Sequence, residues 1–277
     1  MKRAAFFFFP LFAISVLTLP LSVFGQNYVQ RFEKGWIDWS NRIVEAVGIG
    51  MPPSNPINPA QARAVAKSEA ESSARSSLLE LIRGLRIDSK HFIKEAIEQT
   101  DGVYEQLQGF LRNSQMVEVS YMQDGSVKAT IALRLTGSFA DLFLPKNILN
   151  IESVQRPQGS MKPEETYTGL VVDCRGFQVT PALVPLIVDE DGRALYGSAY
   201  ASRDYAVQQG MVAYAKNLTD LQKSPRVGTK PLTVKGLRTA KTGGSDIVIS
   251  DADAAKIKGT ASNLDFLQKC RVIIVLD

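Results

Sequence analysis

The segment NPAQARAVAKSEAESSARSSLLELIRGLRIDS, residues 58–89, decides how the N-terminal half of the chain folds. It predicts a helix over residues 59–83, because Asn58 can accept a hydrogen bond from the first turn and Pro59 needs no donor there. Gly84 predicts a left-handed stop after the last turn. One stripe of this helix has small side chains at helical spacing before two leucines: Ala62, Ala66, Ala70, Ser73, Ser77, Leu78 and Leu81.

A stripe of small side chains lets another main chain approach a helix closely. The preceding segment, GWIDWSNRIVEAVGIGMPP at residues 35–53, predicts a strand whose alternate positions Ala46, Gly48 and Gly50 form a matching small face. We therefore expect this helix to pack tightly on a sheet. A groove for a partner is the alternative interpretation of the stripe.

The rest of the first half contains helix, hairpin and linker signals. A second helix is predicted over residues 89–112, with a break or kink at Asp101–Gly102. Two alternating runs flank Asp124–Gly125, a pair that tolerates the positive φ angles of a hairpin turn. The polar stretch at residues 146–166 contains Pro, Gly and Ser and predicts a linker.

The second half mixes strands and helices without strict alternation. Strands are predicted at residues 166–174, at 182–197 with a turn at Asp191–Gly192, and at 231–240, 245–250 and 270–277; helices are predicted at 202–218 and within 251–268. The fold class is therefore α+β (mixed α/β). We expect two units, residues 26–145 and 167–277, each with helices packed on a small mixed or antiparallel sheet.

The first 25 residues predict an export signal. Lys2 and Arg3 precede an almost wholly apolar run to Leu21, and small residues then favour cleavage between Gly25 and Gln26. An uncleaved membrane anchor is the alternative, because the apolar run approaches the ~20 residues that span a bilayer. The expected location is the periplasm of a Gram-negative bacterium, with the protein at most peripheral to the outer membrane.

The charge balance and the cysteines limit the classes of function. Lys and Arg number 32 and Asp and Glu 28, and this formal charge of +4 is too small to indicate a nucleic-acid partner. Cys174 and Cys270 each sit at the end of a predicted buried strand. They are a candidate disulfide if those strands are neighbours, and otherwise two buried free thiols.

The chain has no pattern of residues that specifies a chemistry. His91 is the only histidine, which excludes a two-histidine metal site and leaves a half-exposed position at a helix start. Trp36 and Trp39 lie near the predicted mature N-terminus, where i, i+3 spacing puts them on opposite faces of a strand. The acids Asp189, Asp191, Asp251 and Asp253 are interpreted first as turn and helix-cap residues, and alternatively as carboxylates that line a cleft between the units. No catalytic, cofactor-binding or metal-binding residue is predicted.

Residues 45–89, with the helix and the Asp-Gly hairpin that follow, resemble the outer-membrane lipoprotein family typified by the small Helicobacter antigen. The same module is similar to the N-terminal domain of the flagellar assembly protein T. The resemblance covers residues 35–144, and this chain lacks the lipobox cysteine of the lipoproteins. The second half resembles exported bacterial proteins that accompany this module.

The resemblance implies an envelope protein with no catalytic residues to transfer to this chain. We therefore expect a non-enzymatic interaction or structural module, in the setting of flagellar assembly. Its partners would be other envelope proteins, including flagellar basal-body components, and it could also form oligomers. A ligand-binding protein or hydrolase with a carboxylate-lined cleft is the alternative.

Overall fold

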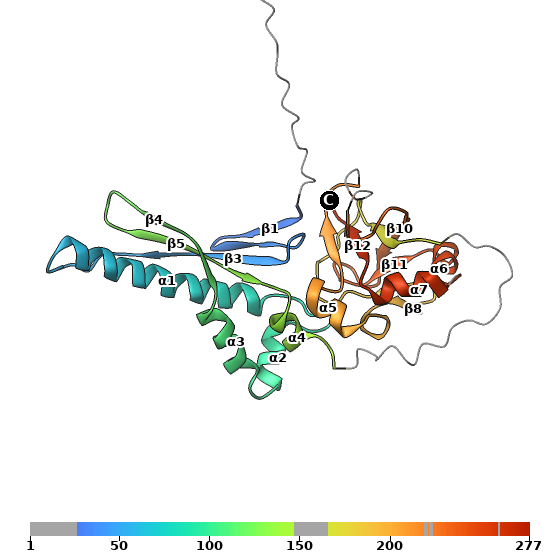
Figure 1. Ribbon diagram of the computed structural model, residues 1–277, viewed down its shortest axis with the longest axis horizontal. Coiled ribbons are helices and arrows are strands. Elements are labelled where there is room, and N and C mark those ends of the chain that lie inside the picture. Colours follow the sequence, from blue (N-terminus) through green and yellow to red (C-terminus); the bar gives the residue numbers. More distant parts are fainter. Residues whose placement is uncertain (1–26, 147–165, 219–220, 222–223, 260) are drawn as a thin grey trace, which may run out of the picture.

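The computed structural model describes residues 27–146, 166–218, 221, 224–259 and 261–277. The predicted leader, its cleavage point between Gly25 and Gln26, and nearly all of the predicted linker lie outside these residues. The described part forms two units that lie end to end, one built on each of two sheets (Figure 1). This arrangement is the α+β class that the sequence predicts.

The N-terminal unit is a five-stranded antiparallel sheet with one long helix on one face. The strand order is β1-β2-β3-β5-β4, with bounds β1 Val29–Phe32, β2 Gly35–Asp38, β3 Ile43–Gly50, β4 Gln115–Tyr121 and β5 Val127–Arg134. The helices are α1 Pro59–Arg83, α2 Ile93–Gln99, α3 Val103–Arg112 and α4 Ser138–Phe143. In Figure 1, α1 and the β4–β5 hairpin extend away from the C-terminal unit as an arm.

The predicted close packing of α1 on the sheet is confirmed. Asn58 caps the helix by accepting a hydrogen bond from Gln61 N, and the buried small side chains of α1 lie against β3. A Cβ atom added at Gly48 would lie 2.1 Å from Ala74 N and 2.2 Å from Ala70 O. Two main chains are therefore in direct contact, which only glycine at this position of β3 allows.

Three local expectations in this unit needed correction or refinement. Residues 35–53 form two strands joined by a turn at residues 39–42, because Arg42 takes a left-handed φ of 57° and reverses the chain. Gly84 ends α1 in the right-handed region, with φ −78°, so the predicted left-handed stop was wrong. The predicted second helix divides into α2 and α3 at Gly102, as the Asp-Gly signal indicates.

The C-terminal unit is a seven-stranded mixed sheet with strand order β8-β7-β11-β10-β6-β12-β9. Its strands are β6 Gly169–Asp173, β7 Ile187–Val188, β8 Ala194–Tyr196, β9 Ala213–Ala215, β10 Pro231–Thr239, β11 Ile247–Ile249 and β12 Val272–Val275. Its helices are the short 3-10 helix η2 Ser198–Tyr200, α5 Arg203–Gln209, α6 Asp251–Lys258 and α7 Ala261–Gln268. The helix predicted over residues 202–218 is shorter than expected, because Gly210 ends it with φ 72° and the chain then enters β9.

The two units share one hydrophobic core and several main-chain contacts. Asn27, just before β1, forms an antiparallel bridge with Ala215 of β9. Ser40 Oγ donates to Tyr214 O at 2.6 Å, and Leu183 N donates to Arg86 O at 3.0 Å. The start of the described chain is thus fixed to its last third. Among the helices described, none is both long and apolar enough to cross a bilayer.

The candidate disulfide between Cys174 and Cys270 is contradicted by the strand register. The predicted neighbourhood is correct, since β6 pairs with β12, but the pairing is parallel with Leu170 opposite Val272. Cys270 is therefore level with Thr168, about 20 Å along the strand from Cys174 at ~3.3 Å per residue. A disulfide requires Cα atoms within about 7 Å. Both cysteines are buried and free.

We expect Gly48→Ala to lower the free energy of unfolding by about 1–3 kcal/mol, because the added methyl group meets the main chain of α1. Gly109→Ala is the control, since a Cβ there meets nothing within 4 Å in α3. That change should be neutral or stabilise by about 0.5–1 kcal/mol. Urea unfolding measures both, and equal effects would contradict the main-chain contact.

We expect the thiols of Cys174 and Cys270 to be unreactive in the native protein. Once the protein is unfolded, both should react fully even though no reductant has been added. Burial, with the nearby Asp173 carboxylate, raises the pKa of Cys174 to about 12, and burial also raises the pKa of Cys270. Near neutral pH the reactive thiolate is therefore scarce. Titration with a chromogenic disulfide reagent, with and without denaturant, measures this. If no free thiol were detected in the denatured, unreduced protein, Cys174 and Cys270 would be disulfide-bonded after all.

Candidate functional site at the junction of the two units

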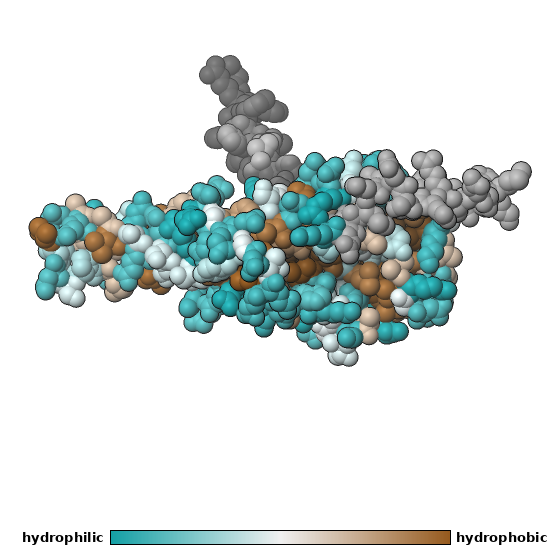
Figure 2. Space-filling view, turned by 90° about the horizontal axis from the view of Figure 1, so that it is seen from below, coloured by the Kyte–Doolittle hydropathy of each residue, from teal (hydrophilic) through white to brown (hydrophobic). Residues whose placement is uncertain are grey.

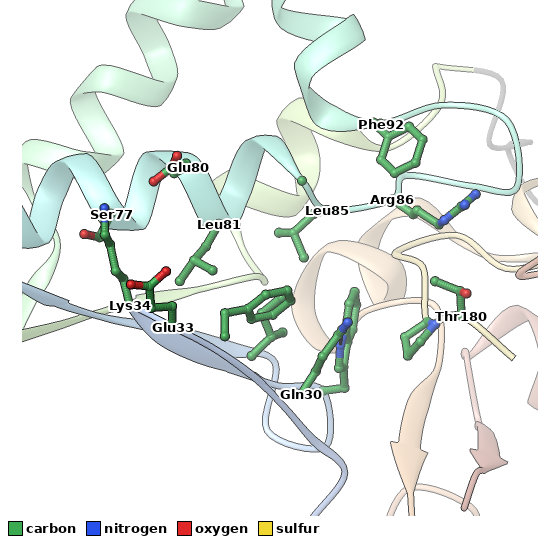
Figure 3. Close-up of a pocket in the computed structure, with 15 residues that line it drawn as sticks. Gln30, Glu33, Lys34, Ser77, Glu80, Leu81, Leu85, Arg86, Phe92 and Thr180 are labelled. Carbon is green, nitrogen blue, oxygen red and sulfur yellow. Dashed lines mark hydrogen bonds between the residues drawn. The ribbon is translucent and has the colours of Figure 1, made fainter. Parts of the chain in front are cut away.

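A pocket of about 460 Å³ lies where the N-terminal and C-terminal units meet (Figure 3). Its walls come from the β1–β2 hairpin, the last turns of α1, the chain that follows α1, and one segment of the C-terminal unit. In Figure 3 the side chains of Gln30 and Lys34 rise from the hairpin toward α1, and Thr180 closes the opposite side. Pockets of this size at a junction of structural units are common ligand sites.

The hairpin wall is fixed by a chain of aromatic contacts. The buried ring of Trp39 meets Tyr214 edge-on with 5.6 Å between centroids, and Trp39 Nε1 donates to Gln30 Oε1 at 3.1 Å. The Tyr214 hydroxyl accepts from Ala182 N at 2.9 Å and donates to Ala182 O at 3.0 Å. Burial raises the pKa of Tyr214, so its hydroxyl keeps the proton that it donates. This wall is therefore preformed.

The opposite wall combines α1 with the segment that leaves it. Leu81 and Leu85 contribute apolar surface, and the Arg86 guanidinium lies over the Phe92 ring, 4.6 Å from its centroid. Arg86 also donates to Ser89 O at 3.4 Å. These contacts hold the cation over an aromatic ring that lines the pocket, where a planar group of a ligand could also stack.

The rim of the pocket has balanced charge. Glu33 and Glu80 oppose Lys34 and Arg86, and among the described residues none of these four forms a salt bridge. The interior is mainly apolar, with Gln30, Ser77 and Thr180 among its polar groups. Such a pocket matches a neutral or zwitterionic ligand with an apolar part better than it matches a strongly charged metabolite.

The four predicted acids lie away from this pocket, so they do not line the cleft between the units. Asp189 is buried at the β7–β8 turn, where Arg193 Nε donates to it at 2.9 Å. Burial alone would raise the pKa of Asp189, but the hydrogen bonds and charge of Arg193 outweigh burial and lower it. Lys258 also approaches Asp189 at 3.5 Å, and Asp191 pairs with Arg193.

The two acidic residues of α6, Asp251 and Asp253, form hydrogen bonds at the start of the helix and with the neighbouring turn. Asp253 N donates to the cap Ser250, and the Asp253 carboxylate pairs with Lys256 at 2.7 Å. Asp251 Oδ1 accepts from Glu190 N at 3.1 Å. The turn and α6 meet through Asp251 and Glu190, each of which accepts from the other's main-chain N–H. The described residues contain no cluster of three or more potential metal ligands.

The single histidine and the two tryptophans have structural positions. His91 precedes α2, is exposed, and its Nδ1 lies 3.0 Å from Asp88 Oδ2. Burial alone would raise the pKa of Asp88, but hydrogen bonds from His91 and Lys90 lower it. Trp36 is half-buried on the sheet face away from α1, whereas Trp39 is buried in the core and lines the pocket.

A second surface of interest is the free end of the arm. Most of the exposed large apolar side chains gather there, and Figure 2 shows hydrophobic patches at this end of the molecule. They come from the end of β3, the chain before α1, the start of α1 and the β4–β5 hairpin: Ile49, Met51, Ile57, Val65, Tyr121 and Met122. We define this set as the arm tip.

Sequence reasoning missed most of the pocket. It singled out Trp39 but assigned no structure to residues 29–32, which form β1 and contribute Gln30 and Phe32. The available signal was two short runs separated by the polar pair Glu33–Lys34 and followed by a glycine, which is a weak hairpin pattern. The contribution of Thr180 and Pro181 had no local signal, because only the tertiary fold brings them to the hairpin.

Comparison with known proteins identifies one similarity. Residues 169–277 match the family model of the second domain of Treponema pallidum Tp0624. A search of curated proteins gives no match. The matched segment spans β6 to β12, so the similarity is one of the C-terminal unit. It includes Thr180 and Pro181 of the pocket but neither the β1–β2 hairpin nor α1.

Proposed function

We propose that this protein is an exported, non-enzymatic interaction module of a Gram-negative cell envelope, and that it binds a partner protein at the junction pocket. The observation that supports this proposal is the pocket itself, which is preformed, mainly apolar and bordered by charged side chains of both signs that form no salt bridge with the described residues. Polar rims around apolar pockets are typical of sites that recognise the side chains of a partner.

The arrangement of the pocket supports binding more than catalysis. Thr180 Oγ1 donates to Gly243 O at 2.8 Å, and among the described residues no histidine or cysteine lines the pocket to activate a hydroxyl. The side chains of Glu33 and Glu80 have no hydrogen-bonded partner among the described residues that would orient them for proton transfer. The hydrolase alternative therefore has no specific observation in its favour.

The setting of the proposed function comes from the sequence. The predicted N-terminal leader supports export, and the resemblance of residues 35–144 to the lipoprotein family and to flagellar assembly protein T supports an envelope site near the flagellar base. The proposed partners are accordingly other envelope proteins, with basal-body components first among them.

A photo-crosslinking amino acid placed at Phe32 should capture a discrete partner in intact cells. Phe32 is 44% exposed at the pocket, and Leu237, 45% exposed on β10, is the matched control position outside it. We expect an adduct from position 32 that is absent from position 237, with the partner identified by mass spectrometry.

Three outcomes would contradict the proposed function. Equal adducts from both positions would show that the pocket is not selective, and absence of any adduct at position 32 would show that it is not a partner site. Recovery of the unprocessed chain in the cytosol, measured by cell fractionation, would contradict export.

A further inference from the structure

β1 is an edge strand of the N-terminal sheet, and no other described strand pairs with its outer side. Just beyond the β1–β2 ladder, Trp39 N donates to Tyr28 O at 3.0 Å and Tyr28 N donates to Ser40 Oγ at 2.8 Å, so Tyr28 and Trp39 form a pair that bonds across the two strands. Such pairs alternate along antiparallel strands, so Gln30 bonds toward β2, while Val29 and Arg31 direct their N–H and C=O groups outward. Within the described ranges, no hydrogen bond satisfies these groups of Val29 and Arg31.

This edge already receives strand residues from elsewhere in the chain. Asn27 forms its antiparallel bridge with Ala215, so the edge of the N-terminal sheet is continued by β9 at one point. Beyond that bridge no described strand pairs with the outer edge of β1, where Arg31 and Phe32 are exposed and Val29 is half-buried. A strand edge whose N–H and C=O groups have no strand partner is a template for one more strand.

The open edge and the pocket share one side of the sheet. Gln30 and Phe32, which alternate with the outward-bonding residues, direct their side chains to the pocket. On a strand added beside β1, the side chains opposite Gln30 and Phe32 would lie on this same face. Every second side chain of the added strand would therefore face the apolar interior of the pocket.

The chemistry of the rim favours a peptide over other ligands. Two acidic and two basic side chains surround the opening, so the local charge is balanced and matches the neutral, dipolar main chain of a peptide. The open edge of β1 adds main-chain N–H donors and C=O acceptors at the spacing of a peptide main chain. A lipid or a charged small molecule has no groups at this spacing.

We propose that an extended peptide segment of a partner protein adds to the outer edge of β1 and inserts an apolar side chain into the junction pocket. The main-chain bonds to Val29 and Arg31 supply affinity, and the pocket selects the inserted side chain. This inference rests on the proposed function, since it specifies how the junction pocket holds its partner.

The probe for this proposal is a library of random linear peptides displayed on phage and selected on the full chain. Enriched peptides should contain a large apolar residue, and a synthetic peptide of the selected sequence should slow amide hydrogen exchange at Val29 and Arg31. The Gln30 amide, which bonds toward β2, should be protected before and after the peptide is added.

Two substitutions at one position separate the main chain from the side chain. Arg31→Pro removes the outward N–H and should weaken binding of the selected peptide by about tenfold, the effect of one lost main-chain hydrogen bond. Arg31→Ala keeps the N–H and should leave the affinity unchanged. At the pocket, Phe32→Glu should weaken binding, while the equally exposed control Leu237→Glu should not. Unfolding midpoints of all four variants verify the fold.

The outcomes distinguish this inference from the proposed function. If position 32 still crosslinks a partner in cells while Arg31→Pro and Arg31→Ala bind equally well, strand addition is wrong and the pocket remains the partner site. If no peptide is enriched, or if an enriched peptide leaves the Val29 and Arg31 amides unprotected, strand addition is also wrong. If position 32 captures nothing, both proposals fail together.

Discussion

The contact between the main chains of α1 and β3 sets the geometry of the whole N-terminal unit. Gly48 and Gly50 face Ala66, Ala70 and Ala74, so the helix lies closer to the sheet than leucine or isoleucine would allow. Close contact over several turns fixes the helix axis along the strands, because a rotation of either element would bring larger side chains into the contact. The final turn of α1 therefore ends at a defined place, and this end forms one wall of the pocket.

The wall of the pocket formed by the β1–β2 hairpin depends on the C-terminal unit. The β1–β2 hairpin is held by Trp39 against Tyr214 of β9 and by the bridge from Asn27 to Ala215, so its position is set by the C-terminal unit. Arg226 strengthens that unit from inside by donating to the carbonyls of Val272, Gln209 and Gly210. Burial, and the charge of Arg42 nearby, lower the pKa of Arg226 to about 10, and at neutral pH it remains a cation. The pocket is thus a product of both units.

Much of the fold follows from local signals, whereas the site does not. The Asn58 cap and the Asp-Gly turns are each encoded by a few adjacent residues, and these predictions held. The small stripe of α1 was right for Ala66, Ala70, Ser77 and Leu78, whereas Ala62, Ser73 and Leu81 are only half-buried and Ala74 and Ile82 are buried instead. The turn at residues 39–42 was missed because its left-handed residue is Arg42, a type that rarely adopts this conformation. The disulfide prediction was wrong because the sequence does not show whether two neighbouring strands run parallel or antiparallel. In the parallel pair of β6 and β12, Cys174 and Cys270 lie far apart along the strands. The pocket joins segments that no local pattern relates.

The bond between Ser40 and Tyr214 joins residues 174 positions apart, and this separation constrains the order of folding. A polypeptide that emerges from a ribosome or a translocation pore with its N-terminus first presents Trp39 long before its aromatic partner is available. Until Tyr214 is available, the indole of Trp39 therefore stays exposed to solvent. A chain in this state is prone to aggregation and would benefit from a chaperone. Only a fully emerged chain can complete the junction, so a nascent or truncated chain lacks it.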